Sequence, residues 1–581
     1  MDNVENIITD NLPIWSSAIQ SKFTAGRGTS SKRNLYGVKK LRELILDLAV
    51  RGLLVPQDPS DEPASVLLEN IAAERDRLVK EGKIKKQKLV TPLQGSEFLS
   101  HCPEGWVITS ISEIAQVQPK NELSDHKDVG FVEMSSISSD HNGSHKQEVR
   151  RWLKVKKGYT HIKDGDIGLA KVTPCFENSK AAIFKGLENG FGAATTELHT
   201  ARFFGDEIVQ DFVLYHLKSA KFLSLGKSRM TGTSGLKRVP KDYFSSYPIT
   251  LAPAHEQHRI VAKVDELMAL CDTLEQQQED SIQAHETLVE VLLEAMSNAV
   301  DGDAFQAAWE RISEHFDALF TTDHSINKLK ETILQLAVMG KLVPQDPSDE
   351  PASVLLEKIA AEKERLVKEG KIKKQKPLLK VSDEEKLDLI SENWQTSRLG
   401  NLGVTSTGKT PSTSNSEFFV GNIPFVGPGQ ITPTGNWIKS DKSLSDKGLQ
   451  QSSEANPNDI LMVCIGGSIG KSAIALEKIA FNQQINAIKP LFIEPRYLKF
   501  AITTKRFHTA IIDNSSGSAT PIINRSKWEA LVVPIPPLAE QHRIVAKVDE
   551  LMALCDQLKN SLQQAQETQI LLTDAVVENA L

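Results

Sequence analysis

The sequence predicts an α/β (α+β) protein in which two mixed α/β domains are separated by long antiparallel coiled-coil helices, in a pseudo-two-fold tandem duplication. Three observations support this fold class. One unit of about 285 residues is written twice, each copy contains a heptad seam, and strand-like patterns lie between the repeated blocks. A chain of 581 residues is also long enough for several domains.

The repeat consists of two blocks that recur with few changes. The first block, Leu41 to Lys88, returns at Leu329 to Lys376 with 40 identities in 48 positions. The second block, Glu256 to Asp272, returns unchanged at Glu540 to Asp556. Because both blocks return in the same order at similar offsets, the chain is a tandem duplication.

Between the blocks lie two stretches of nearly equal length and little mutual identity, residues 95–250 and 392–537, which we name the first and second variable domains. Each opens with a tryptophan, Trp106 or Trp394, followed by an alternating apolar pattern that is typical of strands. We therefore expect one fold with two different surfaces. A constant scaffold that carries two differing domains suits a protein that reads two different targets at a fixed separation.

The repeat also predicts the domain boundaries. We expect two shorter helices in each copy of the first block. In the second copy, the first of these helices ends at Gly340 and the next begins after Pro351. Five parts result: an N-terminal helical conserved region (1–94), the first variable domain (95–250), a central conserved region with a coiled-coil helix and the repeat helices (251–391), the second variable domain (392–537) and a C-terminal coiled-coil helix (538–581).

Each copy of the second block begins a heptad seam, with apolar residues at a spacing of four and three flanked by polar ones. A helix from Ile260 to about Ala299 would be near 60 Å long. Because the two seams share one sequence, we expect them to pack antiparallel on each other, although each could pack on its own neighbouring domain instead. The seam residues, including two cysteines that we interpret as core, are Ile260, Val264, Leu267, Cys271, Leu274, Ile544, Val548, Leu551, Cys555 and Leu558.

Composition excludes several classes of protein. Hydrophobic residues make up 40% and charged residues 25%, which is ordinary for globular domains. The N-terminus has no basic segment before an apolar run, and no apolar run reaches the roughly 18 residues of a membrane span, so we predict a soluble cytoplasmic protein with no membrane partner. Five cysteines without a C-x-x-C pair indicate neither a disulfide framework nor a zinc knuckle.

Charge is distributed unevenly along the chain. The formal net charge of −7 argues at first against a nucleic-acid partner. The first variable domain, however, has 20 Lys and Arg against 18 Asp and Glu, and the second has 14 against 10. Their net charges are therefore +2 and +4, and the rest of the chain carries −13. The variable domains are the basic part of an acidic protein, which weakens the objection to DNA.

Catalytic motifs are absent from the sequence. The run Gly466 to Ser472 invites a P-loop interpretation, but Ile465 occupies the position that needs the first glycine. We predict a hairpin there instead. The sequence contains no G-x-S-x-G elbow and no H-E-x-x-H pair, so it predicts a chain that is not an enzyme and holds no metal or cofactor of its own.

Several segments resemble a known family. The junction Pro537 to Val545 is similar to the one that ends each target recognition domain in specificity subunits of type I restriction-modification enzymes. The segments Asn482 to Ile488, Gly470 to Ala473 and Lys171 to Asn178 resemble parts of the recognition domains, and Tyr36 to Lys88 is similar to the type IB subgroup. The first junction departs from the pattern, with Ala254 and His255 in place of the usual Leu-x.

This resemblance implies a non-catalytic DNA sequence-recognition subunit. Each variable domain would be a target recognition domain that binds one half of a bipartite, asymmetric site on double-stranded DNA, and the coiled coil would set the spacer. The repeated regions would dock two modification (methyltransferase) subunits, which use S-adenosylmethionine to methylate adenine N6. Two restriction (motor-nuclease) subunits, with ATP and Mg, would complete the assembly. Readers on one face of B-DNA need centres about 34–36 Å apart, which a helix of about 60 Å can span.

Short polar side chains on glycine-rich loops, with Arg, Lys, Gln or Asn nearby, suit base recognition. Our hypothesis is that such residues contact DNA, and ordinary turn chemistry is the alternative for each of them. The competing functions are a coiled-coil scaffold or interaction protein whose variable domains bind proteins, and a nuclease with an unrecognised site. The candidate DNA-binding residues are Lys171, Thr231, Thr233, Ser234, Lys237 and Arg238 in the first variable domain, and Lys471, Gln484, Ser516, Ser518, Thr520, Asn524 and Arg525 in the second.

Overall fold

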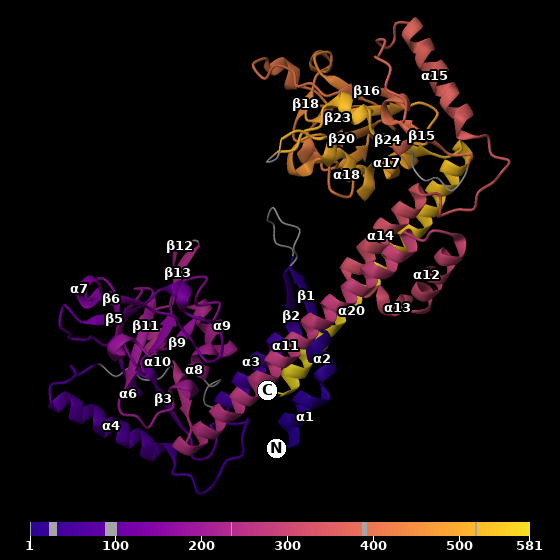
Figure 1. Cartoon of the computed structure of the whole chain (residues 1–581). Coiled ribbons are helices and arrows are strands. Elements are labelled where there is room, and N and C mark those ends of the chain that lie inside the picture. Colours follow the sequence, from indigo (N-terminus) through magenta and orange to yellow (C-terminus); the bar gives the residue numbers. More distant parts are fainter. Residues whose placement is uncertain are drawn as a thin grey trace. The chain divides into compact units, whose positions relative to one another are not determined.

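The computed structural model of the chain describes residues 2–22, 32–87, 102–233, 235–385, 392–517 and 520–580. It consists of two compact units (Figure 1). Unit 1 comprises Met1–Ile282 and Gln564–Leu581, and unit 2 comprises Gln283–Gln563. Each unit therefore contains one variable domain and one copy of the first repeated block. Within the described residues, no helix combines the length and apolarity that a membrane span needs.

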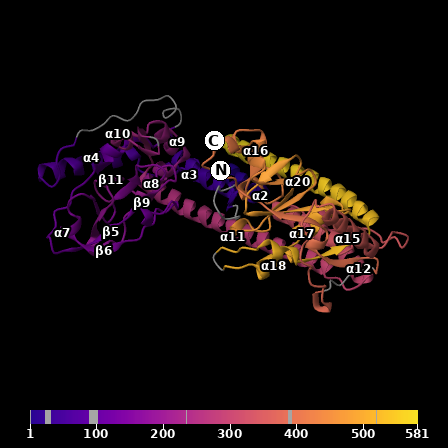
Figure 2. The same ribbon diagram turned by 90° about the horizontal axis from the view of Figure 1, so that it is seen from above.

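Two long helices contribute to both units. Helix α11 (Ala254–Ser297) has 44 residues and α20 (Leu538–Ala580) has 43, so each is roughly 65 Å long. Figure 2 shows α20 as one unbroken helix. In unit 1 the first half of α11 shares a hydrophobic cluster with Val576 and Val577 near the end of α20. The two helices are therefore antiparallel in this unit, as predicted, but α20 makes the contact through its C-terminal end and not through its seam residues.

A third helix joins the seam in each unit, because α3 (Tyr36–Val50) and α14 (Asp323–Val338) both carry a repeated apolar face. In unit 1, Ile260 and Val264 lie in one cluster with the apolar face of α3, and in unit 2, Ile544 and Val548 do so with α14. The two seams lie in separate clusters, so the expectation that they pack on each other was wrong, and each seam instead makes its contacts within its own unit. Equivalent ion pairs reinforce them: Arg42 with Asp272 at 2.6 Å, and Lys330 with Asp556 at 2.5 Å.

The seam cysteines are core residues, as predicted. Cys271 and Cys555 are both buried, and burial raises the pKa of the Cys271 thiol to about 11. Other helices flank the seam. They are α1 (Asp2–Asp10), α2 (Leu12–Ser17) and α4 (Ala64–Lys80) in unit 1, and α12 (Gly302–Glu314), α13 (Phe316–Leu319) and α15 (Ala352–Lys368) in unit 2. A short strand pair, β1 (Ile19–Lys22) and β2 (Lys32–Leu35), precedes α3.

The strands of the variable domains are short. In the first domain they are β3 (Val107–Ser110), β4 (Ala115–Val117), β5 (Asp128–Val132), β6 (Glu148–Arg151), β7 (Thr160–Lys163), β8 (Ile167–Ala170), β9 (Ala181–Ile183), β10 (Phe191–Ala194), β11 (Leu198–Phe203), β12 (Thr231–Thr233), β13 (Leu236–Arg238) and β14 (Pro248–Leu251). In the second they are β15 (Gln395–Arg398), β16 (Gly403–Thr407), β17 (Ile423–Val426), β18 (Ser443–Leu444), β19 (Ser453–Ala455), β20 (Ile460–Val463), β21 (Ser472–Ile474), β22 (Ile479–Phe481), β23 (Ile485–Pro490) and β24 (Val532–Ile535).

The two variable domains share one topology. The sheet β4-β11-β8-β9 corresponds to β16-β23-β20-β21, and the sheet β6-β5-β10-β7 corresponds to β18-β17-β22-β19. In each domain one described pair is parallel, β5 with β10 and β17 with β22. The prediction of one fold with two surfaces is therefore confirmed. The predicted hairpin is also confirmed, because β20 pairs antiparallel with β21.

Short helices cover the sheets and follow the same plan in both domains. Helices α8 and α9 precede the late loops of the first domain, as α17 and α18 do in the second (Figure 1). The helices of the first domain are α6 (Ile111–Ile114), α7 (Trp152–Val155), α8 (Gln210–Lys218), α9 (Ala220–Ser228) and α10 (Lys241–Ser246), and those of the second are α16 (Asp446–Leu449), α17 (Pro495–Thr503), α18 (Lys505–Asn514) and α19 (Arg525–Glu529).

Repeated residues attach each variable domain to its long helix. The Trp106 indole donates a hydrogen bond of 3.0 Å to Glu256 at the start of α11, and Trp394 donates one of 2.9 Å to Glu540 at the start of α20. The ends of each domain pair as strands, β3 with β14 and β15 with β24. The two variable domains are therefore attached to the long helices in the same way.

Candidate nucleic-acid interface

The strand register brings several loops together at one edge of the first variable domain, which we name the first loop edge. Strands β4, β5, β8 and β10 all end there. Their terminal residues pair beside the turn 195–197, since Val117 lies opposite Ala201, Val132 opposite Ala194 and Ala170 opposite Leu198. The loops that follow these strands therefore converge on that turn.

The second variable domain has an equivalent second loop edge. There β16, β17, β20 and β22 end around the turn 482–484. Thr407 lies opposite Asn486, Val426 opposite Phe481 and Val463 opposite Ile485. The same strands in the same order thus present a different set of loops.

Most of the candidate residues of the first domain meet at the first loop edge. Strands β12 and β13 form a hairpin. Arg238 of this hairpin forms a backbone β-bridge with Val172, and the Thr173 amide donates a hydrogen bond of 3.0 Å to the Lys237 carbonyl. This contact brings Lys171, Lys237 and Arg238 into one group. Thr231 and Thr233 are exposed on the hairpin, and Ser234 lies outside the described residues.

Two cations of this group are held by the turn 195–197. The Arg238 guanidinium donates two hydrogen bonds of 2.8 Å to the Glu197 carboxylate, and the Lys171 ammonium donates one of 2.7 Å to the Thr196 carbonyl. The pair lowers the pKa of Glu197 and raises that of Arg238, since each charge stabilises the other. The Arg238 side chain is 42% exposed and its guanidinium has further N–H donors, so it can bind a second acceptor without releasing Glu197.

The candidate residues of the second domain are less uniform. Ser516 forms a backbone β-bridge with Ile522, and the Gly466 amide donates a hydrogen bond of 2.9 Å to the Pro521 carbonyl. These contacts join the loop that contains Ser516 and Thr520 to the β20–β21 turn, which carries Lys471. Gln484 lies in the turn 482–484 of the same edge. Ser518 lies outside the described residues.

Two further candidates have local partners. The Asn524 side chain accepts a hydrogen bond of 2.9 Å from the Lys527 amide and so caps α19. Arg525 forms an ion pair of 3.2 Å with Glu529 one turn along the same helix. The turn chemistry that was the alternative for these residues is thus present at Asn524, and Arg525 is paired within its own helix.

Matching hydrogen bonds show which positions of the two domains are equivalent. The Val239 amide donates to the Lys171 carbonyl at 2.8 Å, and the Ile523 amide donates to the Cys464 carbonyl at 3.0 Å. Position 171 therefore corresponds to 464. By the same pairings Arg238 corresponds to Ile522, and the turn 195–197 corresponds to 482–484. The two domains place different chemistry at the same points, an ion pair in one and carboxamides in the other.

Sequence reasoning missed Glu197 and Gln483. Each lies in the turn that links the two sheets of its own variable domain. The only signal in the sequence that could have identified them is that each follows the end of a strand. Nothing local to Glu197 shows that Arg238, 41 residues away, is its partner.

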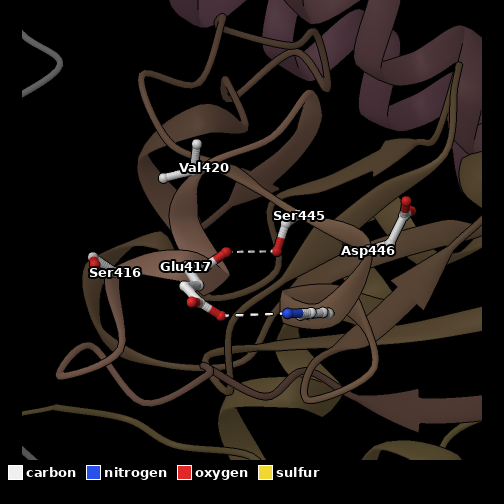
Figure 3. Close-up of a pocket in the computed structure, with 6 residues that line it drawn as sticks. Ser416, Glu417, Val420, Ser445 and Asp446 are labelled. Carbon is white, nitrogen blue, oxygen red and sulfur yellow. Dashed lines mark hydrogen bonds and ion pairs between the residues drawn. The ribbon is translucent and has the colours of Figure 1, made fainter.

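A pocket of about 480 Å³ lies elsewhere in the second domain, between α16 and the loop before β17 (Figure 3). Its Ser445 hydroxyl donates to the Glu417 carbonyl at 2.7 Å, and Lys447 lies 3.4 Å from the Glu417 carboxylate. Because Leu444 pairs with Ile423 at the start of β17, the pocket is at the opposite end of that strand from the second loop edge. Its two carboxylates, Glu417 and Asp446, do not suit DNA.

The described residues contain no group of three or more His, Cys, Asp or Glu side chains that could hold a metal ion. The buried imidazoles are bound to backbone instead. His199 lies 2.9 Å from the Val239 carbonyl and His216 lies 3.1 Å from the Thr250 carbonyl, and burial lowers the pKa of each to about 4.

Comparisons with known proteins identify a family model and several relatives that match this chain. The family model for the type I restriction modification DNA specificity domain matches residues 103–284 and 391–567, one match in each half of the chain. The specificity subunits of the Escherichia coli type I restriction enzymes EcoAI and EcoEI are each 45% identical to this chain, over 597 and 594 residues and over 100% of both proteins. A crystal structure of the HsdS subunit from Thermoanaerobacter tengcongensis is 18% identical, with a TM-score of 0.41 over 83% of this chain and 97% of that one. The matched model and the full-length relatives show that this chain belongs to the type I restriction-modification DNA specificity family.

Proposed function

We propose that this chain recognises a bipartite, asymmetric site on double-stranded DNA, with each variable domain binding one half. The observation that carries the proposal is the pair of loop edges. They share one strand order and one set of backbone hydrogen bonds, yet they present the Glu197–Arg238 pair in one domain and Asn482 to Gln484 in the other. A protein that reads two unlike half-sites needs this combination of constant frame and variable edge.

The long helices would set the unread spacer between the half-sites. Roughly 65 Å of helix exceeds the 34–36 Å between half-sites one DNA turn apart. The net charges of +2 and +4 on the variable domains, against an acidic remainder, support attraction between these domains and DNA phosphates. The candidate contacts in the loop edges, from Lys171 to Arg525, are part of this proposal.

The proposal includes partners. Two modification subunits that carry S-adenosylmethionine would dock on the repeated regions and methylate adenine N6. Two restriction subunits, with ATP and Mg, would act through them. The chain itself would supply recognition and spacing, and the chemistry would belong to its partners. The support for two docking sites is that the first repeated block occurs twice with 40 of 48 residues identical, since identical subunits require two similar surfaces.

Co-expression with a modification subunit, followed by mapping of methylated adenines across a genome, tests the proposed function. We expect one split, asymmetric motif, methylated on both strands, and the motif gives the spacer directly. A stable complex that methylates no such motif would leave the scaffold in place and remove the recognition role of the variable domains. Binding to duplex DNA should also weaken steeply as salt rises, because phosphate contacts release counterions.

Replacing Arg238 with alanine is expected to weaken binding to the first domain's half-site by roughly 10-fold or more and to relax preference at one base pair. Competition binding with single-base variants of the mapped motif measures both effects. Glu197→Gln is the control, because it removes the partner charge but keeps the guanidinium. An equal loss on all sequences would make Arg238 a phosphate contact, and no loss would remove it from the interface.

A further inference from the structure

We propose that Gln483 reads an adenine in the half-site of the second variable domain, and that Thr410 is the residue that orients it. The proposal rests on the proposed function and adds the residue and the base to it. It concerns the turn 482–484 and the loop that follows β16, which the register of β16 and β23 places side by side.

Gln483 is the exposed member of a turn whose other two side chains bind each other. The Asn482 side-chain amide donates to Gln484 Oε1 at 3.2 Å, and the Gln484 backbone amide donates to Asn482 Oδ1 at 3.0 Å. These contacts hold the turn in shape. Gln483 is exposed at its tip, where the loops after β16, β17 and β20 converge.

Thr410 fixes the orientation of the Gln483 carboxamide. Its hydroxyl donates a hydrogen bond of 2.6 Å to Gln483 Oε1. The loop that carries Thr410 is itself anchored, since the Gly408 amide donates to the Ile485 carbonyl and the Lys409 amide to the Phe481 carbonyl, each at 3.0 Å. A Cβ on Gly408 would lie 1.9 Å from the Asn482 carbonyl oxygen, so this close approach of loop and turn requires glycine.

The oriented carboxamide matches the edge of one base. A carbonyl oxygen has two lone pairs, and the Thr410 hydroxyl occupies one. The second lone pair and the NH₂ group form an acceptor and donor side by side, which is the complement of adenine N6–H and N7 in the major groove. Guanine presents two acceptors there, so it leaves the Oε1 lone pair without a donor. The geometry therefore favours adenine over guanine.

The first variable domain shows that the fold does not require an amide at this position. Its equivalent residue is Thr196, whose carbonyl accepts from Lys171. The turn keeps its place between the two sheets while its side chains change from Thr195, Thr196 and Glu197 to Asn482, Gln483 and Gln484. A residue that differs where the frame is constant is expected at a point of recognition.

The test uses the full chain in complex with its modification subunit and duplexes that carry the mapped motif, with each base pair replaced in turn. Gln483→Ala should lose roughly 10- to 100-fold discrimination at one A·T pair and keep it at the other positions. Gln483→Glu should shift preference at that pair towards cytosine, because a carboxylate accepts from cytosine N4. Asn422→Ala is the matched control: Asn422 is an exposed amide before β17, at the opposite end of that strand, and its loss should change nothing.

Thr410 has its own readout. Thr410→Val removes the hydroxyl and should reduce discrimination at the same base pair, whereas Thr410→Ser should retain it. Unchanged preference at every position in Gln483→Ala, or an equal loss on all sequences, would overturn this proposal and leave the proposed function intact. If the unaltered complex methylates no split motif, the result contradicts both this proposal and the proposed function. An unchanged melting temperature shows that a variant is folded.

Discussion

Replacing Arg202 with alanine is expected to lower the free energy of unfolding of the first variable domain by about 3–5 kcal/mol at neutral pH. Arg202 donates to both oxygens of Asp166, at 2.8 and 2.7 Å, and to the Asn121 side chain at 2.9 Å. The Asp166 side chain is 1% exposed. Without the guanidinium this buried carboxylate would keep only the Lys163 backbone amide and the weaker attraction of the Lys163 charge.

The deficit should depend on pH. Burial raises the pKa of Asp166 above its ordinary value even with Arg202 present. A carboxyl whose folded pKa is raised contributes stability below its unfolded pKa and loses it as pH rises through the folded pKa. Removing Arg202 raises the folded pKa further. The variant should therefore approach the unaltered protein at acidic pH and fall behind it as pH rises.

Urea unfolding at several pH values, followed by hydrogen exchange of β8 and β11, measures this effect. Arg202→Lys is the control, because the second variable domain has Lys489 at this position. There burial raises the pKa of the Asp459 carboxyl, and the Lys489 charge offsets part of that rise. The lysine variant should lose less free energy of unfolding than the alanine variant. A deficit in Arg202→Ala that is the same at all pH values would contradict a charge effect and indicate lost packing alone.

Replacing Trp394 with alanine is expected to destabilise unit 2 by about 3–5 kcal/mol. Trp394 is 3% exposed, packs edge-on against Tyr497 with ring centroids 6.5 Å apart, and donates to Glu540. The change leaves both a cavity and a carboxylate that has lost one donor. Hydrogen exchange of β15 and β24 should rise, because these strands attach the second variable domain to α20.

Two variants separate the causes. Trp394→Phe keeps most of the packing and removes the hydrogen bond to Glu540, so it should cost about 1–2 kcal/mol. Trp106→Ala makes the equivalent change in unit 1, where Trp106 donates to Glu256 and packs edge-on against Phe212. If hydrogen exchange rose equally in both units in either alanine variant, the result would contradict the separate cores of the two units.

Local patterns predicted much of this fold. The spacing of Ile260 and Val264 predicted the long helix, and their burial confirms its seam face. Ile465 in place of a glycine excluded a phosphate loop, and the strand-like runs on either side of the glycine turn predicted the hairpin that β20 and β21 form. These predictions succeeded because helix and strand periodicity depends on residues a few positions apart.

The sequence by itself determined the tandem repeat, the long helices, the strand-rich variable domains and the family. The tertiary structure decided which helix shares each seam and which side chains meet at the loop edges. Arg238 donates to Glu197, which is 41 residues away in the sequence, and Thr410 donates to Gln483, which is 73 residues away. The physical reason is that strand register, not spacing along the chain, brings the ends of β4 and β8 together in the first variable domain and those of β16 and β20 together in the second. Register is set by pairing between distant strands.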